Sequence, residues 1–133
     1  MVTISCSGKL HAFALAEQLE RNNKLDSLLT TYAYQKNTFF NRFVKRIDKE
    51  EIPVNKIRTN ISLAFPIKLW PDKVHIWNNL FDLWVAKQLK TSKSKIFIGW
   101  SGMSLHSIIV AKNKGMKTIL ERGSTHIVFQ NEI

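Results

Sequence analysis

The first part of the chain contains the pattern that most restricts the fold: a strand, a glycine turn, a helix and a second strand. Residues 2–6 form a short β-branched run that leads into Gly8, and from Leu10 to Asn22 the apolar residues follow helical spacing. A second apolar run occupies residues 27–34. Strand, helix and strand in this order form a βαβ unit with parallel strands, so the sequence predicts an α/β fold.

The last third of the chain repeats this pattern. Residues 95–98 form a compact apolar strand, and residues 99–102 (GWSG) predict a turn. The next segment has helical spacing, with Ser104 as its predicted N-cap and Gly115 as its predicted stop. Residues 117–120 then predict another strand. The repeat of strand, turn and helix extends the parallel sheet predicted from the first part.

The middle of the chain is less regular. Residues 52–59 predict a short strand, and residues 72–90 predict a helix with Asp72 as its N-cap. One face of this helix is apolar; its residues are Val74, Trp77, Phe81, Trp84, Val85 and Leu89. With 133 residues, the chain suits one domain. We predict a single doubly wound, mostly parallel sheet with helices on both faces.

The charge of the chain restricts its partners. It contains 20 Lys and Arg against 10 Asp and Glu, a net charge of +10. Such a balance favours polyanions, phosphates or an anionic membrane surface, without choosing between them. A basic surface without a specific partner is the other interpretation.

Cysteine use and hydropathy indicate the compartment. Cys6 is the single cysteine and lies in an apolar run, so we expect a buried, unreactive thiol in a reducing compartment. The N-terminal segment has no basic region before its apolar run, and no apolar stretch reaches the ~20 residues that span a bilayer. We therefore expect a cytoplasmic protein.

An aromatic and basic segment, residues 37–51, has two interpretations. It can be an amphipathic helix on anionic lipid, or a core-packed helix with a solvated basic face, which is the commoner case. In the first interpretation the membrane-facing residues are Phe39, Phe40, Arg42, Lys45 and Arg46. Neither a recognition helix nor a sheet with interleaved aromatic and basic residues is evident, so no nucleic-acid partner is expected.

Three polar turns follow predicted parallel strands and should meet at one edge of the sheet, where such folds bind ligands. They are residues 7–9 with His11, residues 99–102 and residues 121–126. Gly8 lets a phosphate approach the backbone of a helix N-terminus, although a plain tight turn explains this glycine equally well. The dinucleotide and P-loop fingerprints are absent, and the histidines have no metal-ligand spacing.

The third turn has the densest polar chemistry. His126 is the best candidate for chemistry because Glu121, Arg122, Ser124 and Thr125 surround it. Arg122 can pair with a carboxylate or a phosphate. The structural interpretation is a Glu–Arg pair followed by a Ser or Thr helix cap.

These turns resemble part of a known family. The chain is similar to the N-terminal half of the retaining group 1 (family 4) glycosyltransferases, which have the GT-B architecture. Most of the resemblance lies in the last 40 or so residues: Gly-Trp-Ser-Gly at 99–102, Ala-Lys at 111–112 with Gly115, and Glu-Arg-Gly-Ser with a following His at 121–126. The Ser-Gly turn at residues 7–8 matches more weakly, and the middle of the chain matches little.

The resemblance implies a Rossmann-like, acceptor-side domain over residues 1–133. Its partners would be a nucleotide sugar, as substrate and not cofactor, and a saccharide or lipid-linked acceptor. No metal is implied. The associated roles are catalytic for Arg122 and His126, donor or phosphate binding for Gly8, Gly123 and Ser124, and acceptor binding for His11, Trp100, Ser101 and Glu121.

The sequence also departs from this family. Many members have His then Gly at the strand tip, where this chain has Arg122 then Gly123. The donor-binding C-terminal domain, with its Glu-x7-Glu motif, has no counterpart here, so the chain is expected to be a truncated part that is inactive alone. The family's lipid-linked acceptors and the basic segment favour peripheral attachment to the inner face of the plasma membrane.

Overall fold

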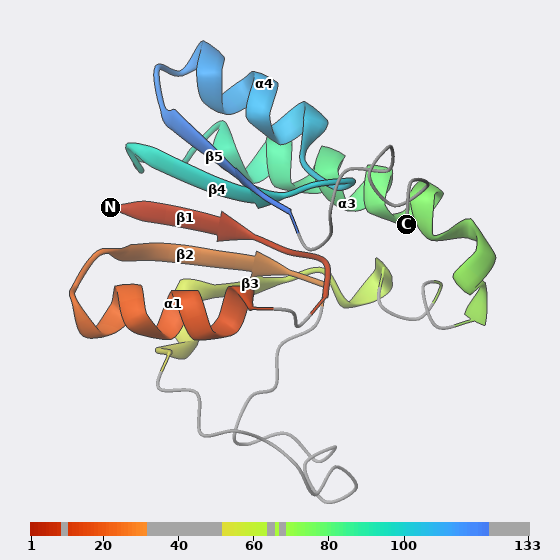
Figure 1. Ribbon diagram of the computed structural model, residues 1–133, viewed down its shortest axis with the longest axis horizontal. Helices are drawn as coiled ribbons and strands as arrows, with labels where there is room; N and C mark the ends of the chain where they lie inside the picture. Colours follow the sequence, from red (N-terminus) through yellow and green to blue (C-terminus); the bar gives the residue numbers. More distant parts are fainter. Residues whose placement is uncertain (9–10, 32–51, 64–65, 67–68, 123–133) are drawn as a thin grey trace, which may run out of the picture.

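The described part of the chain, residues 1–8, 11–31, 52–63, 66 and 69–122 of a computed structural model, forms five strands and three α-helices (Figure 1). The strands are β1 (Val2–Ser5), β2 (Leu25–Thr30), β3 (Ile57–Thr59), β4 (Ile96–Trp100) and β5 (Lys117–Glu121). The α-helices are α1 (Ala12–Arg21), α3 (Val74–Leu89) and α4 (Leu105–Asn113). Short 3-10 turns occur at η2 (Val54–Lys56), η3 (Ile61–Leu63) and η4 (Pro71–Lys73).

The five strands form one sheet in the order β3-β2-β1-β4-β5, and each neighbouring pair is parallel. β1 lies at the centre, between β2 and β4. The chain therefore moves outward to one side of β1 first and returns later to build the other side. The predicted α/β fold with a parallel sheet is confirmed.

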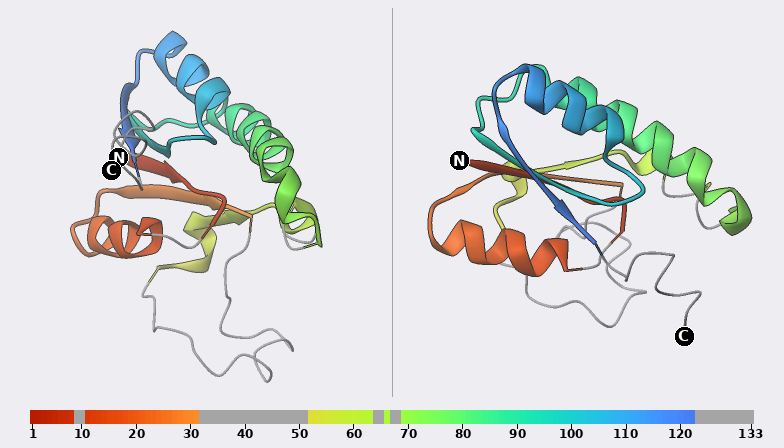
Figure 2. Two further views of the ribbon diagram at one scale, coloured as in Figure 1. Left: turned by 45° about the vertical axis from the view of Figure 1, so that its right-hand side comes forward. Right: turned by 45° about the horizontal axis from the view of Figure 1, so that its top comes forward.

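Helix α1 covers one face of the sheet (Figure 2). Its Phe13 and Ala16 pack in a buried cluster with Ile4, Leu28 and Ile98, which lie on that face of three neighbouring strands. Strand side chains alternate between faces, so the apolar residues of β1 at every second position supply this layer. The helix ends where predicted: Asn22 is the C-cap, and Asn23 follows with a φ of 55°.

Helices α3 and α4 lie side by side on the opposite face (Figure 2). Phe81, Val85 and Leu89 of α3 pack against Leu29 of β2 and Phe97 of β4 in a second buried cluster. Helices on both faces make the sheet doubly wound, as predicted. Gly115 ends α4 with a φ of 76°, which confirms its predicted role as the C′ residue.

The predicted core face of α3 is correct only in its C-terminal half. Phe81, Val85 and Leu89 are buried, whereas Val74 is exposed. Trp77 and Trp84 are half-buried. The reason is that the N-terminal part of the helix projects beyond the sheet and has no layer beneath it (Figure 1).

Neither residue predicted as an N-cap makes a side-chain cap hydrogen bond within the described part of the chain. Asp72 lies in the turn η4, and the N-cap position of α3 is Lys73, with no side-chain cap among the described residues. Ser104 does occupy the N-cap position of α4, but its hydroxyl makes no cap hydrogen bond. The carboxylate of Asp82, in α3, accepts hydrogen bonds from the backbone N–H groups of His106 and Ser107 instead.

Strand boundaries differ from the predictions because the hydrogen-bond ladder, and not local composition, sets them. The second strand lies at Leu25–Thr30 and not at residues 27–34. Gly99 and Trp100 belong to β4, where they pair with Leu120 and Glu121, so the predicted turn begins only at Ser101. The predicted helix at residues 37–51 lies outside the described residues.

Candidate functional site

The candidate site lies at the carboxyl edge of the sheet, where β1 and β4 end beside each other. The chain leaves β1 toward β2 on one side and enters β4 on the other, so the two loops that follow these strands diverge. In open α/β sheets such a switch point is where ligands bind. Strands β1, β4 and β5 all end at this edge, at the tips of the strand arrows in Figure 1.

Ser7 connects three parts of this edge. Its hydroxyl donates to Oδ1 of Asn78 in α3 at 3.1 Å, and lies 3.2 Å from Sδ of Met103 in the loop after β4. Its backbone N–H also points to that sulfur at 3.2 Å, and its carbonyl accepts a 2.5 Å hydrogen bond from the hydroxyl of Thr31. The β1 loop is therefore fixed to the ends of β2, α3 and β4 at once.

The loop after β4 is joined to the end of β5 through the backbone. The N–H of Ser101 donates to the carbonyl of Glu121 at 2.9 Å. Ser101, Gly102, Glu121 and Arg122 are all exposed there. Gly102 has a φ of 84°, which L side chains rarely adopt, and open space around it. Polar side chains and accessible backbone thus lie together at this edge, as the sequence predicts.

Two predicted residues near the start of α1, Gly8 and His11, are exposed. His11 holds the N-cap position, is exposed and makes no side-chain cap hydrogen bond among the described residues. Gly8 is exposed, with nothing within 4 Å of the position a Cβ would take. Both predicted residues are accessible from the carboxyl edge.

Cys6 lies directly beneath this turn and is fully buried, as the sequence predicts. Burial raises the pKa of its thiol, and a hydrogen bond from the backbone of Gly8 opposes this rise in pKa to a smaller extent. The thiol is therefore neutral near pH 7 and is a poor nucleophile. Cys6 supports the site by packing and not by chemistry.

Trp100 has a different environment from the other predicted acceptor-binding residues. It is 5% exposed and packs in the cluster beneath α1 with Phe13 and Ile98. The structure places this indole in the core, behind the carboxyl edge, while Ser101 beside it is exposed. Alternation places Trp100 on the same face of β4 as Ile98, beneath α1, whereas Ser101 lies in the turn beyond the end of the strand.

Several predicted residues lie outside the described part of the chain. They include Gly123, Ser124 and His126 of the third polar turn. They also include the whole membrane-facing set, Phe39, Phe40, Arg42, Lys45 and Arg46.

Sequence reasoning missed a row of hydroxyls on one face of β1. Thr3, Ser5 and Ser7 alternate along the chain, and Thr3 and Ser5 are buried on the side of α3. Ser5 pairs with Gly99 of β4, and the Oγ of Ser104 lies only 2.3 Å from where a Cβ on Gly99 would be. The alternation of Thr and Ser in residues 3–7 was the available signal.

Ser5, from this row, and Ser104, from the loop after β4, have unused hydrogen-bonding capacity. Within the described residues, Oγ of Ser5 and Oγ of Ser104 are buried and have no hydrogen-bond partner. Both lie next to Gly99, just below the carboxyl edge. Buried polar atoms without partners are uncommon and call for an explanation, such as an ordered water or a polar ligand group.

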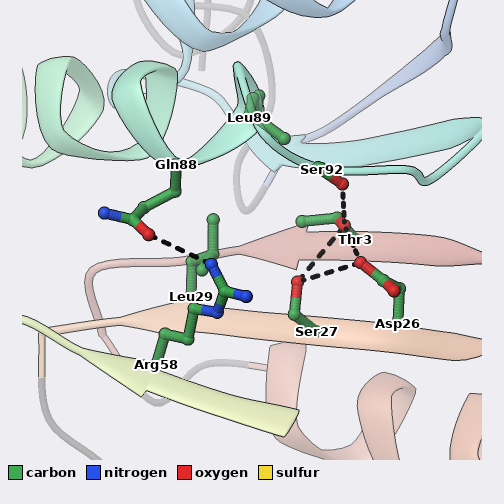
Figure 3. A pocket seen from close by; sticks show the side chains of 8 residues that line it. All are labelled: Thr3, Asp26, Ser27, Leu29, Arg58, Gln88, Leu89 and Ser92. Carbon is green, nitrogen blue, oxygen red and sulfur yellow. Dashed lines mark hydrogen bonds between the residues drawn. The ribbon is translucent and has the colours of Figure 1, made fainter.

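A small pocket lies further back, toward the amino ends of the strands, between the sheet and the C-terminal end of α3 (Figure 3). Its cavity volume is about 20 Å³, lined by hydroxyl groups near Thr3 and by Asp26. Oγ1 of Thr3 lies 2.7 Å from Oγ of Ser94, and Arg58 donates to Gln88 at 3.2 Å. This volume holds about one water molecule, far below the ~300 Å³ of a ligand pocket. We therefore assign it a structural role.

The described residues contain neither a cluster of metal ligands nor a membrane-spanning helix. Among them, no group of three or more His, Cys, Asp or Glu side chains is placed to hold a metal ion. In the same residues, no helix combines the length and the apolar character that crossing a bilayer requires.

The strand order and the two helical layers define a Rossmann-like α/β domain with a five-strand all-parallel sheet. Comparisons with protein-family models, with curated proteins and with solved structures find no match for this chain. The assignment to a fold class therefore comes from the strand order, the parallel pairing and the helices themselves.

Proposed function

We propose that this chain is the acceptor-side part of a glycosyltransferase of GT-B architecture. The enzyme would transfer a sugar from a nucleotide sugar to a saccharide or lipid-linked saccharide in the cytoplasm, at the inner face of the plasma membrane. The observation that carries the proposal is the convergence of the resembling segments. The turn at residues 7–8, the end of Gly-Trp-Ser-Gly at 99–102 and the Glu-Arg pair at 121–122 lie at one sheet edge.

The roles follow from accessibility and charge. Gly8 and His11 are exposed near the N-terminus of α1, where backbone N–H groups and the helix dipole favour an anionic or polar group. Ser101 and Glu121 present polar groups suited to sugar hydroxyls. Arg122 is exposed at the end of β5, where its guanidinium can stabilise the charge that develops on the leaving diphosphate.

The net charge of +10 is also compatible with a second class of function. A basic α/β binding module for nucleic acid or anionic lipid would bind its ligand alone, with strong salt dependence. We favour the transferase because polar side chains and open backbone meet at the ligand-binding edge of the sheet.

The test is an assay of the whole gene product for release of nucleoside diphosphate from a panel of nucleotide sugars. Saccharides and a lipid extract of native membranes serve as acceptors. Acceptor-dependent release supports the proposal. A complete lack of release across the panel, combined with tight and salt-sensitive nucleic-acid binding by the chain alone, would replace it with the binding-module function.

A further inference from the structure

Helix α3 is apolar on the side that faces away from the protein. Ile76, Leu80 and Leu83 recur at i, i+4 and i+7 and are between 41% and 45% exposed. They lie opposite Phe81 and Val85, which are fully buried against the sheet. A surface helix normally carries polar residues on its outward face, so an apolar outward face indicates a surface that is covered in the working protein.

The N-terminal half of α3 also projects past the sheet. The first buried residue of the helix is Phe81, and the preceding part extends beyond the carboxyl ends of the strands (Figures 1 and 2). Leu69 and Trp70, just before the helix, are 66% and 50% exposed. The rings of Trp70 and Trp77 lie 6.5 Å apart at 33°. This part of the protein is an apolar, tryptophan-bearing projection.

Helix α4 extends the same surface. Leu105 and Ile109, one helical turn apart, are 68% and 50% exposed, while Ser107 and Ala111 on the other side of the helix are buried. α3 and α4 pack against each other on one face of the sheet, so their outward sides form a common outer layer (Figure 2). We call this layer, with Leu69 and Trp70, the α3–α4 surface.

The charges of the α3–α4 surface are mainly positive. Lys73, Lys87, Lys90 and Lys112 are exposed along it. Of the two aspartates in this region, Asp82 is buried under α4 and Asp72 is exposed beside Lys73. Apolar residues flanked by lysines, with tryptophan at the projecting end, match the interface of an anionic bilayer.

We propose that the α3–α4 surface docks on anionic lipid, with the projection at residues 69–80 entering the interface. Protein–protein interfaces are depleted of lysine at their centres, whereas here Lys87 lies within the apolar row, at i+7 from Leu80 and i+4 from Leu83. A second copy of the chain would also carry a net charge of +10, which opposes self-association. The inference stands on the exposed side chains and does not depend on the proposed transferase activity.

The experiment is co-sedimentation with vesicles of phosphatidylcholine alone and of phosphatidylcholine mixed equally with phosphatidylglycerol. We expect binding to the mixed vesicles, weakened by salt, and at least about tenfold weaker binding to the neutral ones. The variant Trp70→Ala/Leu80→Ser should lose about tenfold in affinity because it removes two apolar contacts. Lys87→Gln and Lys90→Gln should each lose about fivefold.

Val54→Ser is the matched control. Val54 is 57% exposed but lies in η2, which the Lys56–Glu20 ion pair ties to α1 on the other face of the sheet. Its affinity for vesicles should equal that of the unmodified chain. All these side chains are exposed, so circular dichroism should show the same fold for each variant.

A second readout locates the contact. Brominated lipid should quench the fluorescence of the bound chain, and Trp70→Phe should retain binding while it loses much of this quenching. Equal affinity of Trp70→Ala/Leu80→Ser and the unmodified chain would overturn the proposal, as would equal binding to neutral and anionic vesicles. A stable dimer that these substitutions dissociate would instead assign the surface to a second copy.

Discussion

Asp82 of α3 accepts two hydrogen bonds from Ser107 of α4, one from the backbone N–H at 2.9 Å and one from the hydroxyl at 2.6 Å. A third comes from the N–H of His106 at 2.6 Å. At the other end of this helix pair, Nζ of Lys114 donates to the carbonyls of Leu89, Lys90 and Ser92. Each helix thus supplies the cap of the other, with the charge that the helix dipole favours at each end.

Replacing Asp82 should destabilise the protein. Asp82→Ala removes the cap and leaves two backbone N–H groups at the start of α4 without their acceptor, so we expect a loss of about 2–3 kcal/mol in the free energy of unfolding. Urea denaturation followed by circular dichroism measures it. Asp72→Ala, which removes an exposed aspartate with no cap role, should stay within about 0.5 kcal/mol. Equal effects of the two substitutions would contradict the cap assignment.

Gly99 should not tolerate a side chain. A Cβ there would lie 2.3 Å from Oγ and 2.7 Å from Cβ of Ser104, so Gly99→Ala should cost about 1–3 kcal/mol in thermal or urea unfolding. Gly8→Ala, where a Cβ meets nothing within 4 Å, is the control and should be nearly neutral.

The same prediction can be tested by coupling. Ser104→Gly removes both clashing atoms, so the double variant Gly99→Ala/Ser104→Gly should be more stable than the sum of the single effects predicts. Strictly additive effects would mean that the contact between Gly99 and Ser104 does not limit this position.

Cys6 should make stability fall at high pH. Burial raises the pKa of its thiol above its ordinary value of 9.0, so the folded state keeps the proton that the unfolded state releases. The resulting stability is fully present below the unfolded pKa and is lost as the pH rises through the folded pKa. Comparison of the unfolding free energy of Cys6→Ala and the unmodified chain across this range isolates the effect.

Cys6 should also be protected from reagents. A thiol reagent at pH 8 should modify it at a rate set by unfolding, and rapidly in urea. Fast modification of the native chain would contradict its burial beneath Gly8.

Arg122 should affect turnover more than stability. It is exposed at the end of β5, so Arg122→Ala should change the unfolding temperature little while it lowers turnover of the whole gene product at least about tenfold. Lys24→Ala, which removes an exposed cation just before β2, at the opposite end of the strands, is the control for general charge loss. Lost thermal stability with normal turnover would support a structural role for Arg122.

The fold could be predicted well from local pattern. The strand in the run at residues 2–6 and the stop at Gly115 depend on side chains within a few positions, and the structure confirms both of them. Ser7, Ser101 and Glu121 lie at one edge because they end or follow parallel strands, which share a carboxyl edge.

The features that the sequence did not predict depend on contacts between distant parts of the chain. Asp82 belongs to a segment whose neighbours predict a buried apolar face, and its role as a cap appears only once α4 packs beside α3. Serine is a residue type that favours N-caps, yet the hydroxyl of Ser104 lies against Gly99 and makes no cap hydrogen bond. Trp100 next to a polar turn predicted ligand contact, while strand alternation directs it into the core.

The central position of β1 has a consequence for how the protein is made. A ribosome releases β1, α1 and β2 early, and these can associate at once because they are neighbours in the chain. The other edge of β1 stays unpaired until β4 has been synthesised. The contact between Ser7 and Met103, for example, joins positions 96 residues apart. During this interval the nascent chain has an open central edge in its sheet, which makes the delay before β4 emerges its most aggregation-prone period.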